Sequence, residues 1–261
     1  MFEALIPWEP SLLIPLCLIV AAVVYARGSA GDARWRQVCF WSGLFGYYTA
    51  LFTQFDYAAE HLFFVHRLQH SLIHHMAPFL IALSQPSRAL IAGLPPSLRG
   101  WTGRLKALSW LNRPVVAVCL FCALIAIFLI PSVHFYAMLD VRLYKLMNAL
   151  MVINGLMFWT LMLNGALSPA VRIVMMLAIV PPQIVIGFLL VMAGRDLYPL
   201  YDLCGRTGGF DAVTDQTLGG AVIWLSAMMM SGLGIVVVVA RGSFTARRPS
   251  GSPAYPPPSV R

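Results

Sequence analysis

Apolar runs of about twenty residues recur along the chain, and they constrain its fold more than any other feature. Two clear examples are PVVAVCLFCALIAIFLIP at 114–131 and LGGAVIWLSAMMMSGLGIVVVVA at 218–240. A helix needs about 20 apolar residues to cross the hydrocarbon core of a bilayer. Only 11% of the 261 residues are charged, against about 25% in soluble domains. The sequence therefore predicts an integral membrane protein that is solvated by lipid.

The apolar runs show no alternation of period two, so we expect helices rather than a closed barrel. A helix satisfies every backbone polar group within its own span. The sequence predicts an all-α, polytopic bundle of about seven transmembrane helices, at 7–26, 37–55, 60–83, 114–131, 143–163, 170–193 and 218–240. This transmembrane domain covers 1–241. The remaining stretch, 242–261, is rich in Pro, Ser and Arg, and is predicted to be a disordered cytoplasmic tail.

The distribution of charge predicts the orientation. When alternate loops are assigned to the two sides, thirteen of the 18 Lys and Arg residues fall on one side, four on the other and Arg67 inside a span. Nine of the ten acidic residues fall on the side with few basic residues. Basic loops favour the cytoplasm, so we expect the N-terminus outside and the C-terminus inside. The net charge of +8 follows from this topology and does not indicate a nucleic-acid partner.

The stretch HRLQHSLIHHM, residues 66–76, places four of the six histidines inside a predicted span. At about 100° per residue, His66, His70 and His74 share one face of a helix, and His75 lies about 140° from His70. Ionisable groups near the bilayer centre cost about 2.5 kcal/mol or more, so they face the interior of a bundle and often mark a functional site. This face is the first candidate for function.

The histidine spacing favours a metal site. His66 and His70 lie one helical turn apart and can chelate one ion, as can His70 and His74. Neutral imidazole suits copper, zinc and iron. A further ligand must come from another segment, and the candidates near the outer side are His61, Glu60, Asp56, His134 and Asp215. The alternative interpretation is that these histidines only form hydrogen bonds between packed helices.

Several motifs resemble those of the CtaG family of cytochrome c oxidase assembly proteins. HRLQHSLIHHMAPFLIALSQP resembles the third-helix motif of the family, with matches at His66, Gln69, His70, Pro78 and Pro86. VTDQTLGGAVIW resembles a second motif, with matches at Asp215, Gln216, Gly219, Gly220 and Trp224. NGLMFW at 154–159 and LYPLY at 197–201 resemble two further family segments. The matches occur in the family's order between about residues 60 and 225.

Two positions depart from the family pattern. Ile130 stands where the family usually has a histidine before a proline, and Met147-Asn148 stands where it often has Glu-His. His134 is the candidate substitute for the first of these. If the family's site uses those histidines, this chain binds metal differently or not at all.

The resemblance implies a multi-pass protein of the bacterial plasma membrane that helps to assemble haem–copper oxidases and assists copper delivery. Its partners would be oxidase subunits and a periplasmic copper donor, and it would not be an enzyme. We therefore expect a copper site drawn from His66, His70, His74, His61, His134 and Asp215. Two alternatives stay open: a membrane haem protein with one of these histidines as an axial ligand, and a metal-free scaffold for oxidase subunits.

Overall fold

A computed structural model describes residues 6–8, 11–100, 110–164 and 167–246 of the chain. The last helix continues to Ala246, past the predicted domain boundary at 241. The rest of the predicted tail, 247–261, lies outside the described residues, as do Arg104 and Lys106. The disorder of the tail stays a prediction.

The all-α prediction is confirmed for the ranges that the structure describes, which hold helices and no strand. The helices are α1 (Leu13–Gly28), α2 (Arg34–Phe52), α3 (Gln54–His61), α4 (Phe63–Ser71), the π-helix η2 (Leu72–Met76), α5 (Ala77–Ser84), α6 (Ser87–Gly93), α7 (Pro96–Arg99), α8 (Pro114–Leu129), α9 (Pro131–Leu139), α10 (Val141–Asn164), α11 (Pro169–Ala178), α12 (Val180–Met192), α13 (Leu200–Leu203) and α14 (Ala212–Ala246).

The number of helices fit to cross a membrane is lower than predicted. Within the described residues, three qualify by length and composition: Val141–Asn164, Pro169–Met192 and Ala212–Arg241. A fourth is added if α8 and α9, bent by 77°, count as one span. The other predicted spans are helical but fall short, because α1 has only 16 residues, α2 begins with charged residues, and the third predicted span is divided among α3, α4, η2 and α5. This measure supports three or four spans rather than seven.

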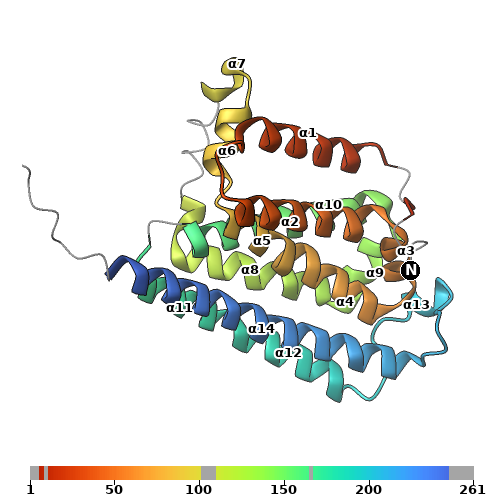
Figure 1. Cartoon of the computed structure of the whole chain (residues 1–261). Helices are drawn as coiled ribbons and strands as arrows, with labels where there is room; N and C mark the ends of the chain where they lie inside the picture. Colours follow the sequence, from red (N-terminus) through yellow and green to blue (C-terminus); the bar gives the residue numbers. More distant parts are fainter. Residues whose placement is uncertain (1–5, 9–10, 101–109, 165–166, 247–261) are drawn as a thin grey trace, which may run out of the picture.

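The long helices lie side by side, and the short helices α3, α9 and α13 gather at one end of the bundle (Figure 1). At the other end, Arg241 of α14 donates hydrogen bonds to the carbonyls of Leu83 and Leu163. These carbonyls close α5 and α10, where a helix leaves its last C=O groups without partners. One arginine thus joins the ends of three helices.

The interior of the bundle is apolar and closely packed. Its largest cluster contains Phe121, Phe158, Trp159 and Met162, each at most 2% exposed. Apolar side chains also cover the outer surface, for example Val236, which is 65% exposed. An apolar exterior around an apolar core is typical of a protein that lies in a lipid bilayer.

A π-helical turn interrupts the histidine-bearing helix and changes its register. Pro78 has no N–H for the carbonyl of His74, and its ring would collide with that carbonyl in a regular α-helix. The chain widens into η2 over Leu72–Met76, and a π-bulge of this kind adds a residue to the turn. His75, which regular spacing directs away from His70, is 2% exposed and lines the same cavity as His70 and His74. The expectation that His75 lies far from the polar face is wrong.

Helix α10 packs directly against this π-turn. A Cβ atom at Gly155 would lie 2.6 Å from the carbonyl oxygen of His74 and 3.0 Å from the ring of Pro78. Only glycine fits such an approach. The contact fixes α10 beside the histidines and brings its polar side chains to them.

Candidate functional site

His66 and His70 form a close pair on α4. Their Nε2 atoms lie 2.9 Å apart, and the two side chains are 0% and 7% exposed. The pair results from regular helix geometry, because α4 is unbroken from Phe63 to Ser71. The structure thus brings together the two histidines that the spacing predicts as a pair.

Tyr201 of α13 links this pair to His134 of α9. Its hydroxyl lies 2.9 Å from Nδ1 of His66 and 2.9 Å from Nε2 of His134. His134 therefore belongs to the cluster, although it reaches His66 only through the phenol. We did not predict a role for Tyr201, and its signal in the sequence was its place in LYPLY.

The direction of each hydrogen bond follows from the contact between His134 and the backbone carbonyl of Phe128. The carbonyl of Phe128 can only accept, so His134 donates from Nδ1 and its Nε2 accepts from Tyr201. The phenol stays protonated, since burial raises the pKa of Tyr201 far above its ordinary value. For neutral imidazoles, His66 then donates from Nδ1 to Tyr201, and its Nε2 lone pair points at His70.

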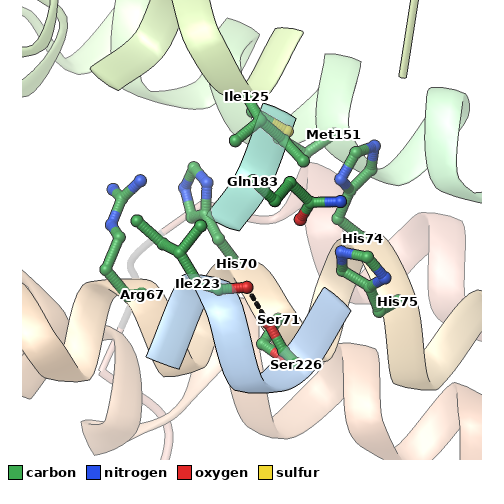
Figure 2. Close-up of a pocket in the computed structure, with 10 residues that line it drawn as sticks. All are labelled: Arg67, His70, Ser71, His74, His75, Ile125, Met151, Gln183, Ile223 and Ser226. Carbon is green, nitrogen blue, oxygen red and sulfur yellow. Dashed lines mark hydrogen bonds between the residues drawn. The ribbon is translucent and has the colours of Figure 1, made fainter. Parts of the chain in front are cut away.

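His74 and His75 form a second group, deeper along the helix. His74 has its Nε2 2.8 Å from Oδ1 of Asn154 and stacks on Phe121 at 4.0 Å between ring centroids. Both histidines line a cavity of about 30 Å³. Figure 2 shows them on one side of the cavity, with Arg67 and His70 on the other. The cavity therefore separates His74 from the His66–His70 pair.

Asp215 stabilises the start of α4. Its two carboxylate oxygens accept hydrogen bonds from the backbone N–H groups of Phe63 (2.9 Å) and Phe64 (2.8 Å). The same carboxylate forms an ion pair with Arg206. Asp215 is 0% exposed. These contacts occupy both oxygens and give the residue a capping role.

The remaining candidates also lie apart from the pair. His61 has its Nδ1 2.8 Å from the carbonyl of Tyr57 in its own helix. Asp56 accepts hydrogen bonds from Gln69 (2.6 Å) and Tyr144 (2.7 Å). Across the part of the chain that the structure describes, no three His, Cys, Asp or Glu side chains converge as a metal site. Of the predicted site, the structure brings together the pair His66–His70, and His134 is linked to His66 through the hydroxyl of Tyr201.

The second motif, DQTLGG, joins the ends of several helices near α13. Gln216 accepts from the N–H of Leu197 (2.8 Å) and donates to the carbonyl of Leu190 (3.0 Å). A Cβ at Gly220 would lie 2.7 Å from the carbonyl oxygen of Gly187, so α12 and α14 pack backbone to backbone. The motif is therefore structural, and it positions the loop that carries Tyr201.

Comparison with known proteins supports the motif resemblance. A family model described as cytochrome c oxidase caa3 assembly factor (CtaG) matches residues 17–243. No curated protein and no solved structure matches the chain. The family match covers every motif named above and most of the chain. The chain therefore belongs to the family of cytochrome c oxidase caa3 assembly factors.

Proposed function

We propose that this protein is a non-catalytic assembly factor that holds copper transiently at His66 and His70 and passes it to a haem–copper oxidase. The observation that carries the proposal is the 2.9 Å separation of their Nε2 atoms. Copper is the cargo here. The oxidase-assembly role comes from the family, and the copper step rests on the pair.

The separation suits two ligands of one ion. With a metal–imidazole bond of about 2.0–2.1 Å, two nitrogens at this spacing subtend about 90° at the ion. The pair supplies two ligands and leaves the other positions open. A donor or acceptor protein can fill an open position, so such a site favours transfer over storage.

The hydrogen bonds around the pair allow both imidazoles to bind an ion in their neutral form. Nε2 of His66 already presents a lone pair, because its Nδ1 donates to Tyr201. His70 needs only to move its proton from Nε2 to Nδ1. Both ligands are then neutral imidazoles, the form that binds metal.

We further propose that the chain is a multi-pass protein of the bacterial plasma membrane, with the N-terminus outside and the C-terminus in the cytoplasm. The basic asymmetry of the loops supports this orientation. It puts α3, α9 and α13 at the periplasmic end, where a copper donor and oxidase subunits would meet the pair. Reporter fusions near Gly100 should be active only in the cytoplasm, and activity confined to the periplasm would reverse the orientation.

A metal-free scaffold is the alternative function. The observation that favours it is the lack of a third protein ligand among the described side chains. Haem binding has less support, since the cavity beside the histidines measures about 30 Å³, whereas pockets for larger ligands span about 300–1,000 Å³.

The test compares three alanine variants at equal abundance in the membrane. His66→Ala and His70→Ala should lower active oxidase under limiting copper, and added copper should partly restore it. His61→Ala is the matched control, since this histidine lies outside the cluster, and it should leave oxidase assembly unchanged. Purified wild-type protein should bind copper, and the two cluster variants should lose it.

Tyr201→Phe tests the arrangement of the pair. This change removes the hydroxyl that joins His66 and His134 but keeps the ring. Copper binding should weaken without being lost, because both ligands remain while the tautomer of His66 is released. If the two histidine variants assemble oxidase normally under limiting copper, the pair is structural and the scaffold function is favoured.

A further inference from the structure

Arg67 is buried in the bundle without an acidic partner. Its side chain is 3% exposed and its guanidinium lies over the ring of Phe63, 5.0 Å from the ring centroid. It forms a hydrogen bond with Tyr201. Its Nε and Nη2 atoms have no hydrogen-bond partner. Within the described ranges, no ion pair joins Arg67 to a carboxylate.

A buried guanidinium needs a compensating charge. An ion left unpaired in a protein interior costs several kcal/mol, and arginines inside membrane proteins usually pair or line an ion pathway. A contact with an aromatic face offsets only part of that cost. The ring of Phe63 therefore does not replace a counter-ion.

The carboxylate that stabilises the start of the helix carrying Arg67 is already used. Asp215 caps the N-terminus of α4, four residues before Arg67, but both its oxygens bind backbone N–H groups and Arg206. Arg206 itself has three acidic neighbours, Asp196, Asp202 and Asp215. These three carboxylates pair with Arg206, and within the described residues none of them forms an ion pair with Arg67.

A cavity lies against Arg67. It has a volume of about 30 Å³, and Arg67, Ser71 and Ser226 are among its lining residues (Figure 2). That volume holds about one or two water molecules. A halide ion is little larger than water and fits there, whereas phosphate, sulfate or a lipid headgroup does not.

We propose that this cavity binds one small monovalent anion, of which chloride is the probe, as the counter-ion of Arg67. The guanidinium has two N–H-bearing atoms without a hydrogen-bond partner, and Arg67 and Ser71 line the same cavity. The anion site needs no metal, which distinguishes it from the copper proposal, although His70 also lines this cavity.

The test uses the purified full-length protein in detergent micelles, exchanged into gluconate at constant ionic strength. The thermal midpoint should rise as chloride replaces gluconate and then saturate, because a ligand that binds only the folded state stabilises it. Bromide should act like chloride, and sulfate should have no effect. Arg67→Gln should abolish the rise, whereas Arg88→Gln, at an exposed arginine, should keep it.

A second measurement does not depend on how the variant folds. Crystals of the wild-type protein grown in bromide should give an anomalous-difference peak beside Arg67. Equal midpoints in chloride and gluconate, an equal effect of sulfate, or a crystal without that peak would each overturn the anion site and leave water as the occupant. Loss of copper binding in His66→Ala would leave the chloride response intact, so the two proposals fail independently.

Discussion

Replacing Asp215 by alanine removes one carboxylate that stabilises two parts of the fold. The first is the N-terminus of α4, where the N–H groups of Phe63 and Phe64 lose their acceptors. Loss of a helix cap costs about 0.5–2 kcal/mol. The second is Arg206, which loses its buried partner; the Arg206 side chain is 7% exposed. Breaking a buried pair costs about 3–5 kcal/mol when it leaves a charge without compensation.

Arg206 keeps other partners, so the lower end of that range applies. Asp202 remains at 2.9 Å and Asp196 at 3.7 Å. Because one carboxylate serves both roles, the two costs are not independent. We expect Asp215→Ala to lower the free energy of unfolding by about 3–4 kcal/mol.

Asp202→Ala is the matched control, because Asp202 pairs with the same arginine while its side chain is 59% exposed. An exposed pair contributes about 0–1 kcal/mol. Both variants are measured by denaturation in mixed micelles, with tryptophan fluorescence as the signal. Equal losses in the two variants would refute the capping role of Asp215, and so would an Asp215→Ala protein as stable as the wild type.

Two further changes test the packing of α10 against the π-helix and the hydrogen bonds of Asp211 at the start of α14. Gly155→Ala should destabilise the bundle by about 1–3 kcal/mol, because its Cβ would lie 2.6 Å from the carbonyl of His74. Gly232→Ala, where nothing lies within 4 Å, should be neutral or stabilising, and denaturation of both variants decides between them. Hydrogen bonds from Thr214 lower the pKa of Asp211 from its ordinary value of 3.8. The contribution of ionised Asp211 to the stability of the fold is therefore complete above pH 3.8, and it is lost as the pH falls through the lowered pKa. In Asp211→Asn the free energy of unfolding should therefore fall less steeply with decreasing pH below 3.8 than in the wild type. An unchanged slope would contradict this role of Asp211.

The sequence predicted what depends on regular helix geometry. The apolar runs located the long helices, because burial and lipid contact both select apolar side chains. The pair His66–His70 followed from a spacing of one turn in a segment without a break. The motif matches then identified the family, which the match over 17–243 confirms.

The errors arose where one residue changes the register or where a partner comes from far along the chain. Pro78 turns the preceding residues into a π-helix, so a regular 100° projection misplaces His75. Asp215 bonds residues about 150 positions away, and no local pattern distinguishes such a cap from a metal ligand. Tyr201 lies in a short helix, and a single tyrosine carries no periodic signal.

The question raised by the polar helix is how a membrane protein stabilises so many ionisable groups. Most of them are satisfied inside the fold: His66 and His134 by Tyr201, His74 by Asn154. The partners Tyr201 and Asn154 are uncharged, so these hydrogen bonds suit neutral imidazoles and add no charge to the bundle. Arg67 is the exception, since its charge persists at any pH that the protein meets. Among the described residues the fold leaves the charge of Arg67 without an ion pair, and for this reason we propose an anion beside it.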